Sequence, residues 1–225
     1  MDTYQNQTLD IHMNQIIGTQ KCQMTDENQS QIKNENKELD DLKETIVRRE
    51  TVHEGKIVRF EKLVVEMPNG VNADRDIIRH PGGCVIIPVD EENNLYLVKQ
   101  YRVAFESVTL ELPAGKLDKG EEPIVCATRE LEEETGLQAQ EIRAVISVYL
   151  SPGFCDEVLH VFMATGLKQG VARPDDDEFV KIEKYSIAEL MTMIQTGEIK
   201  DAKTVIGVMI AERRLRNDAE GQIDL

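Results

Sequence analysis

Four glutamates lie within five residues in the stretch Arg-Glu-Leu-Glu-Glu-Glu-Thr-Gly-Leu, residues 129–137. The stretch reads as the end of a helix, because Pro123 suits the first helical position and Gly136 suits a left-handed C-terminus. Apolar residues recur along it at helical spacing and predict a buried stripe. The members of this stripe are Ile124, Ala127 and Leu131.

A second face of the same helix would carry only carboxylates, those of Glu130, Glu133 and Glu134. Like charges three or four residues apart on a helix repel by roughly a few tenths of a kcal/mol per pair. A bound divalent cation would remove that repulsion, since Mg²⁺ prefers oxygen ligands and binds through carboxylates together with substrate phosphates. The alternative is a solvated acidic helix face. The glutamates alone leave both interpretations open.

The charge of the whole chain narrows the classes of partner. Its 225 residues carry a formal net charge of −16, whereas nucleic acids and membrane surfaces call for basic patches. No apolar run is long enough to span a membrane, and the N-terminus has no secretory signal pattern. The four cysteines lack CxxC spacing, which favours reduced thiols. We therefore expect a cytoplasmic protein with no nucleic-acid or membrane partner.

The pattern of residue types predicts an α+β chain. Residues 1–43 are rich in Gln and Asn and are expected to be a disordered tail, because they bury too little apolar surface. Two β-rich runs joined at Pro68-Asn69-Gly70 predict a hairpin. Further strands are expected at 45–52, 82–90, 94–102, 141–150 and 157–167, with the run at 82–90 central to its sheet. Helices are expected at 186–197, with Ser186 and Glu189 as a capping box, and at 201–216.

A wider spacing links the acidic helix to the loop before it. Gly115 is followed after five residues by Glu121, after seven more by Arg129-Glu130-Leu131, and then by Glu133-Glu134 and Gly136-Leu137. This spacing resembles the Nudix box, and all nine specified positions match. The resemblance implies an α/β/α sandwich with a mixed sheet. It also implies an extra N-terminal antiparallel sheet over residues 44–80, a Nudix hydrolase domain over 81–217 and a C-terminal tail over 218–225.

Flanking segments are similar to the ADP-ribose pyrophosphatase branch of that family. These segments are ELPAGKLDKGEE from residue 111, SPGFCDE from residue 151 and KQYR at 99–102, and Pro152 follows Gly136 at the branch's distance of sixteen residues. The resemblance implies a small-molecule nucleoside diphosphate sugar as substrate. It also implies a homodimer, in which the sheet at 44–80 exchanges with a second subunit and helps to build the adenine pocket. Phe60 and Tyr101 are candidates for stacking on the base.

The resemblance also assigns roles in metal binding and catalysis. It implies that Mg²⁺, or Mn²⁺ in its place, is held by three glutamates and by the backbone carbonyl of Ala114. The three are Glu130, Glu133 and Glu134, and Glu133 also joins the catalytic set. Arg129 would pair with Glu121 or Glu133 and hold the carboxylates in place. The second acidic cluster, Asp175-Asp176-Asp177-Glu178, would supply the catalytic base, with Glu178 the preferred residue and Asp176 and Asp177 as alternatives. A solvated loop is the other interpretation of this cluster.

Five further residues are predicted to bind substrate. Arg102 ends a strand, and its bidentate guanidinium suits a diphosphate. The other interpretation is a surface ion pair, which would contribute little to stability. The others are Arg79, Glu111, Pro152 and Gly153.

The predicted reaction is hydrolysis of the diphosphate of ADP-ribose to AMP and ribose 5-phosphate. One alternative is a hydrolase of another nucleoside diphosphate sugar such as GDP-mannose, because pocket residues choose the base and the sugar. A second alternative is a non-catalytic Nudix domain that senses ADP-ribose. A non-catalytic domain is expected to lack some residues of the Nudix box, and here all nine specified positions are present.

Overall fold

The computed structural model describes residues 41–173 and 179–220, and side chains up to residue 217. The chain divides into two compact units. The smaller unit consists of residues 1–48 and 64–73, and the larger consists of residues 49–63 and 74–225. The predicted disordered tail at 1–43 and the acidic cluster at 175–178 lie almost wholly outside the described residues.

Twelve strands and four helical segments follow one another along the described chain. The strands are β1 (Thr45–Glu54), β2 (Arg59–Glu66), β3 (Asn72–Arg79), β4 (Gly83–Pro88), β5 (Asn94–Arg102), β6 (Ser107–Glu111), β7 (Ala114–Lys116), β8 (Leu137–Gln138), β9 (Glu141–Tyr149), β10 (Val158–Thr165), β11 (Lys168–Gln169) and β12 (Val180–Ser186). The helices are the 3-10 turn η1 (Val103–Phe105), α3 (Pro123–Thr135), α4 (Ile187–Gln195) and α5 (Ala202–Glu220). Among the described residues no helix is long and apolar enough to cross a membrane.

A mixed sheet of order β7-β4-β10-β9 forms the centre of the larger unit. Strands β4 and β10 run parallel, with Leu159 opposite Gly83, whereas β7 and β9 are antiparallel to their neighbours. The predicted central strand is confirmed, because every residue of β4 is buried. A second sheet has the order β12-β5-β6, and β8 pairs with β11.

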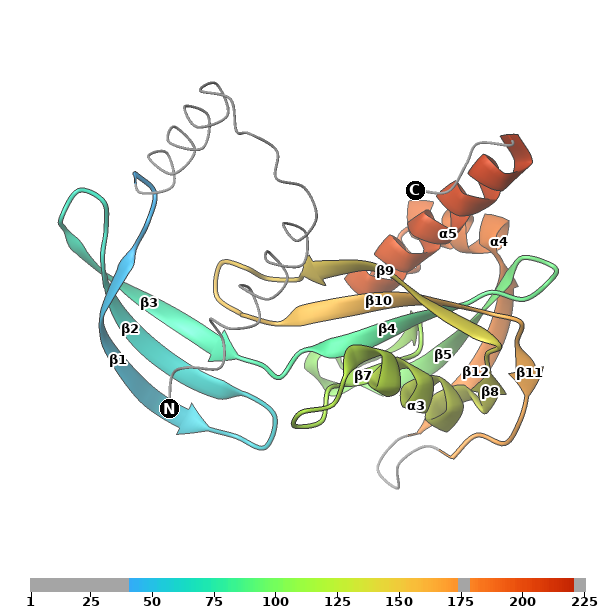
Figure 1. Cartoon of the computed structure of the whole chain (residues 1–225), viewed down its shortest axis with the longest axis horizontal. Helices are drawn as coiled ribbons and strands as arrows, with labels where there is room; N and C mark the ends of the chain where they lie inside the picture. Colours follow the sequence, from blue (N-terminus) through green and yellow to red (C-terminus); the bar gives the residue numbers. More distant parts are fainter. Residues whose placement is uncertain (1–40, 174–178, 221–225) are drawn as a thin grey trace, which may run out of the picture. The chain divides into compact units, whose positions relative to one another are not determined.

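The two faces of β4 contact different helices (Figure 1). Side chains alternate along a strand, so Cys84 and Ile86 pack with α3 while Val85 and Ile87 pack with α4 and α5. Burial of apolar side chains on both faces is the main stabilising contribution in such a layered unit. The mixed sheet therefore lies between helices, as the sequence predicts.

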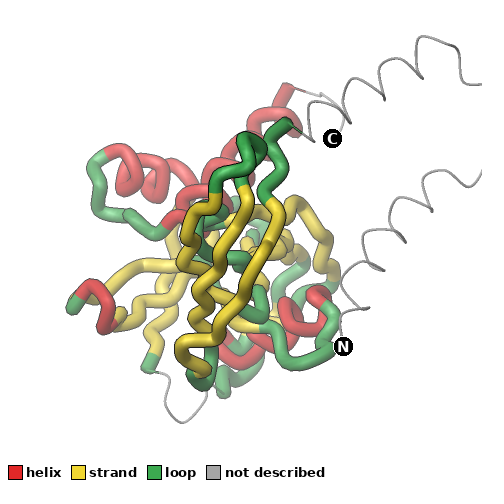
Figure 2. Tube along the Cα trace, turned by 90° about the vertical axis from the view of Figure 1, so that its left-hand side faces the viewer, coloured by secondary structure: helices red, strands yellow, loops and turns green. Residues whose placement is uncertain are grey.

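Strands β1, β2 and β3 form a three-stranded sheet in that order, and Figure 2 shows strands side by side in its foreground. The predicted hairpin is present in the smaller unit, where the Gly70 amide donates to the Met67 carbonyl at 2.8 Å. Gly70 has a φ of 76°, a left-handed conformation that glycine adopts without steric cost.

Local signals place the helix ends well but leave out several strands. The capping box of Ser186 and Glu189 is present, and α3 begins at Pro123 and ends before Gly136, whose φ is 69°. The helix predicted at 201–216 extends to Glu220. Strands β6, β7 and β12 were not expected, and they form edges of the four-stranded sheet and of the sheet that contains β5.

Candidate active site

Helix α3 turns the acidic stretch toward the protein interior. Ala127 and Leu131 are buried in the cluster beneath the helix, as predicted, but Ile124 is 43% exposed, so the predicted stripe is wrong at that position. Cys126 takes the place of Ile124 in the buried stripe. Because Ile124 stands in the first turn of the helix, it lies beyond the area that the sheet covers.

Two of the three predicted metal-binding carboxylates are withdrawn from solvent. Glu130 is 8% exposed and Glu134 is 3% exposed, whereas Glu133 is half-buried. Burial of ionised carboxylates is costly unless cations or hydrogen-bond donors compensate for it. This face is therefore not an ordinary solvated acidic surface.

Arg129 binds three carboxylates at once. Its Nε and Nη2 donate to the two oxygens of Glu121, both at 3.0 Å, and its Nη1 donates to Glu130 at 2.7 Å and to Glu133 at 2.9 Å. The sequence predicted a pairing with Glu121 or Glu133, and both are present. Hydrogen bonds from Arg129 lower the pKa of Glu121, and the hydrogen bond to Glu121 raises the pKa of Arg129. We call Arg129, Glu121, Glu130 and Glu133 the Arg129 cluster.

The loop before α3 lies directly against these carboxylates. A Cβ placed on Gly115 would stand 1.8 Å from the carboxylate of Glu130, so only glycine permits this approach. The amide of Ala114 donates to Glu134 at 3.0 Å. Strand β7, which begins at Ala114, pairs with β4 through Gly115 and Cys84, and this pairing fixes the loop beneath the helix.

The donor chemistry of this site suits a hard divalent cation. Three carboxylates contact the guanidinium of Arg129, and Glu134 lies next to Glu133 in the chain. All four carboxylates are oxygen donors of the kind that Mg²⁺ prefers. In the described residues, no three side chains of Asp, Glu, His or Cys are grouped as a ready-made metal site. The reason is visible in the contacts, because Arg129 lies between Glu130 and Glu133 while Glu134 binds the Ala114 amide.

Arg102 and Glu111 line a cavity of about 900 Å³. Arg102 binds Glu111 through Nε and Nη2, each at 2.7 Å, and Lys203 and Thr109 also donate to this carboxylate. Burial acts to raise the pKa of Glu111, but the hydrogen bond from Arg102 and the charge of Lys203 outweigh it and hold the pKa at about 2. Arg102 is thus both an ion-pair partner and part of a cavity wall.

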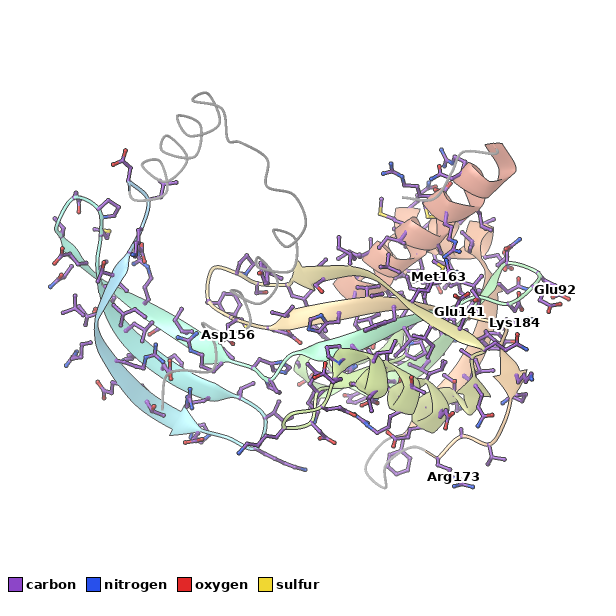
Figure 3. All side chains as sticks on the ribbon, viewed as in Figure 1. Glu92, Glu141, Asp156, Met163, Arg173 and Lys184 are labelled. Carbon is purple, nitrogen blue, oxygen red and sulfur yellow. The ribbon has the colours of Figure 1, made fainter. Side chains whose placement is uncertain are left out.

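A second, smaller cavity of about 280 Å³ is lined by Arg79 and Pro152. Arg79 donates to Glu61 at 2.9 Å and to Asp156 at 3.0 Å. Figure 3 labels Asp156 in the connection between β9 and β10. Gly153 follows Pro152, and a Cβ there would meet no atom within 4 Å. The predicted substrate-binding residues therefore fall into two groups, and segment 150–152 borders both cavities.

Other predictions find less support or lie outside the described residues. Glu178 and its neighbours at 175–177 are not described. Tyr101 is exposed and, with Phe60, lines neither of these two cavities, whereas Phe105 lines the larger one. Cys126 is a poor nucleophile, because a hydrogen bond with Cys84 and burial raise the pKa of its thiol.

Sequence reasoning missed two residues that organise these groups. Lys203 contacts Glu111 from 92 positions away, and Glu61 binds Arg79 from 18 positions away. The stretch Asp-Ala-Lys-Thr at 201–204 signals a helix start, but nothing local reveals the distant partner of Lys203. The only signal for Glu61 was an acidic residue within a β-rich run.

Comparison with known proteins decides the family. The NUDIX domain family matches residues 78–206. The chain belongs to the Nudix family. Its relatives include a methanol dehydrogenase activator from Bacillus methanolicus, 42% identical, and an ADP-ribose pyrophosphatase from Bacillus subtilis strain 168, 38% identical. Each alignment covers 74% of this chain and 91% of the relative.

Two further proteins are similar to this chain at lower identity. A GDP-mannose pyrophosphatase from Citrobacter koseri is 31% identical over 58% of this chain and 77% of its own length. A solved structure described as a crystal structure of ADP compounds hydrolase has a TM-score of 0.69 at 23% identity, covering 80% of this chain and 97% of its own. This likeness confirms the Nudix fold. Nudix hydrolases generally need divalent metal ions.

Proposed function

We propose that the chain is a metal-dependent pyrophosphatase that hydrolyses the diphosphate of ADP-ribose to AMP and ribose 5-phosphate. The observation that carries this proposal is the Arg129 cluster with Glu130 packed on Gly115, in a chain 38% identical to an ADP-ribose pyrophosphatase over most of that protein. The intact cluster also argues against the alternative of a non-catalytic sensor.

The carboxylates of α3 and the loop before it are proposed to hold Mg²⁺, with Mn²⁺ as a substitute. Glu130, Glu133, Glu134 and the carbonyl of Ala114 would be its ligands. When bound, such an ion neutralises charge on a diphosphate and lowers the pKa of a bound water. Arg129 would keep the carboxylates in place, as its four hydrogen bonds to them support. Glu178 remains the proposed base that activates the attacking water.

The proposed substrate contacts come from both cavities. Nη1 of Arg102 makes no hydrogen bond within the described residues, so it can donate to a phosphate oxygen from the wall of the larger cavity. Glu111 would hold that guanidinium in place. Arg79, with Pro152 and Gly153, would contact the substrate on the side of the smaller cavity.

The proposed assembly is a cytoplasmic homodimer built through residues 44–80. All residues of β1 are exposed, including Ile46, Val47 and Val52, and β1 is an edge strand. An exposed apolar edge strand is a template for pairing with another chain. The remaining domain boundaries, 81–217 for the hydrolase domain and 218–225 for the tail, are proposed unchanged.

A second candidate substrate is another nucleoside diphosphate sugar. Its support is the 31% identity to a GDP-mannose pyrophosphatase. The pocket, and not the box, selects the base and the sugar. GDP-mannose is therefore the first alternative in any substrate panel.

Product analysis tests the proposal. Wild type and Glu134→Gln are incubated with ADP-ribose, with and without Mg²⁺, and AMP is quantified. We expect AMP from wild type with Mg²⁺ only, and a collapse of turnover in the variant, whose folding is checked by circular dichroism. Absence of AMP from wild type would remove ADP-ribose as the substrate, and GDP-mannose would then be assayed.

A further inference from the structure

The first turn of α5 is tied to the segment that carries Glu111. Asp201 caps the helix, because its Oδ2 accepts hydrogen bonds from the amide of Thr204 at 3.0 Å and from its hydroxyl at 2.6 Å. The buried hydroxyl of Thr204 accepts a hydrogen bond from the amide of Leu112 at 2.8 Å. The neighbour of Leu112 is Glu111. The start of α5 and the residue that follows β6 are therefore held together next to Lys203.

Lys203 bridges the two segments by ion pairs. Its ammonium lies 3.0 Å from Asp201 and also binds Glu111. The side chain of Lys203 is 12% exposed, whereas that of Arg102, on the same carboxylate, is 44% exposed. Lys203 is thus the inner cation of the pair, and Arg102 is the outer cation that a ligand in the cavity meets.

The carboxylate of Glu111 fixes the direction of Arg102. Both Glu111 oxygens accept hydrogen bonds from the guanidinium, and Lys203 shares the oxygen that binds Nη2 of Arg102. A carboxylate held by a second cation keeps a single orientation, so the guanidinium bound to it keeps one as well. Preorganised donors bind an anion without the entropic cost of ordering a flexible side chain.

We propose that Lys203 is a positioning residue, which acts through Glu111 to fix Arg102 against the diphosphate of the substrate. This inference rests on the proposed function, since the diphosphate is the anion that Arg102 would meet. Lys203 also lines the larger cavity, and in the proposed role it acts through Glu111 and not by contact with the substrate. Its loss should weaken substrate binding more than it slows turnover, because ground state and transition state share the diphosphate contact.

The test is steady-state kinetics on ADP-ribose at saturating Mg²⁺. The variants are Lys203→Met, Lys203→Arg, Glu111→Gln and the double variant Lys203→Met/Glu111→Gln. Lys203→Met should raise KM on the order of tenfold, the size of one charge-assisted hydrogen bond, with kcat changed less than about threefold. Lys203→Arg keeps the charge, so its KM should be close to that of wild type.

A matched control separates this effect from the loss of any lysine–carboxylate pair. Lys184 pairs with Asp90 at 3.0 Å and with Glu92 at 3.4 Å. Figure 3 shows Lys184 and Glu92 together, well away from Asp156. Lys184→Met should leave KM and kcat within about twofold of wild type, because exposed pairs contribute little.

The double variant tests whether Lys203 acts through Glu111. In the Glu111→Gln background the additional Lys203→Met change should leave KM within about twofold, because the linking carboxylate is already gone. A KM increase that persists in this background would mean that Lys203 meets the substrate directly, and it would overturn the positioning role. An unchanged KM in Lys203→Met would overturn it as well.

Separate measurements distinguish a folding defect, and a failure of the proposed function, from a failure of the positioning role. Urea unfolding identifies a variant whose defect is only stability. Lys203→Met leaves the carboxylate of Glu111 with one cation fewer, which can prevent folding. In that case the KM of the double variant, which has no carboxylate at position 111, is compared with the KM of Glu111→Gln, and a difference above twofold overturns the proposal. Wild type without AMP release would remove the proposed function together with this inference. Wild-type turnover with equal KM in all variants would remove the inference alone.

Discussion

Two ion-pair clusters in the larger unit have opposite compositions. In the Arg129 cluster one guanidinium faces three carboxylates. In the other, which we call the Glu61 cluster, one carboxylate faces the guanidinium groups of Arg49, Arg59 and Arg79. The first has a formal excess of two negative charges and the second an excess of two positive charges.

The two clusters also differ in how far water reaches the side chains that carry the excess charge. Glu61 is 1% exposed, but its three arginines reach water, so their surplus charge is hydrated. Glu121 and Glu130 are largely covered, and Glu130 rests on the backbone at Gly115. Surplus charge that water does not reach requires a counterion. The comparison therefore supports the proposed cation binding at the Arg129 cluster and a mainly stabilising role for Glu61.

The largest expected effect comes from removing the single cation of the acidic cluster. Arg129→Met leaves Glu121, Glu130 and Glu133 without the group that orients them. We expect kcat/KM for ADP-ribose to fall by about 100-fold, the upper range for losing a residue that orients metal ligands. Arg129→Lys keeps the charge but not the forked guanidinium, so its kcat/KM should lie between those of wild type and Arg129→Met. Activity within threefold of wild type would show that the cluster needs no organiser.

Removing the single anion of the basic cluster should affect stability rather than chemistry. Glu61→Gln is expected to lower the free energy of unfolding at pH 7 by about 2 kcal/mol, since charged hydrogen bonds are lost but the arginines remain hydrated. Urea denaturation measures this change. A loss of turnover without a loss of stability would contradict the division of roles.

The effect of Glu61→Gln on the free energy of unfolding should also depend on pH. Burial acts to raise the pKa of Glu61, but the hydrogen bond from Arg79 and the nearby guanidinium charges lower it below its ordinary value of 4.5. A lowered pKa stabilises the fold above the unfolded value, and this stabilisation is lost as the pH falls toward the folded value. The stability difference between wild type and Glu61→Gln should therefore be full at pH 6 and shrink below pH 4.5.

A smaller effect should follow from filling the space beneath Glu130. Gly115→Ala places a methyl group where the Glu130 carboxylate lies, 1.8 Å away, so the carboxylate must move from its bond with Arg129. We expect kcat to fall on the order of tenfold, because a shift near 1 Å in a reactive group is costly. The melting temperature should change little, since the end of a side chain yields more readily than backbone. Wild-type kcat in this variant would mean that Glu130 need not lie on Gly115.

The smallest effect is expected for an ion pair outside both clusters. Lys184→Met should leave the midpoint of urea denaturation nearly unchanged, because the ammonium is exposed and its pair with Asp90 is screened by solvent. Urea denaturation beside Glu61→Gln gives the direct contrast. A loss as large as that of Glu61→Gln would show that burial does not set the difference.

The clusters also explain what could be predicted from the sequence. The Arg129 cluster lies within one helix and the loop before it, so fixed spacing reveals it, just as apolar runs reveal β4 and capping residues reveal α4. The Glu61 cluster draws on three strands, and the contact of Lys203 with Glu111 joins positions 92 apart. Such contacts depend on how strands and helices pack, which local periodicity does not encode. The exposure of Ile124 has the same origin, because the sheet covers only part of α3.

Binding of Mn²⁺, followed by electron paramagnetic resonance on wild type, Glu134→Gln and Glu61→Gln, tests the central claim most directly. The account predicts that wild type and Glu61→Gln bind the ion equally and that Glu134→Gln binds it at least about tenfold more weakly. Equal binding by wild type and Glu134→Gln would contradict the assignment of the metal to the carboxylates of α3.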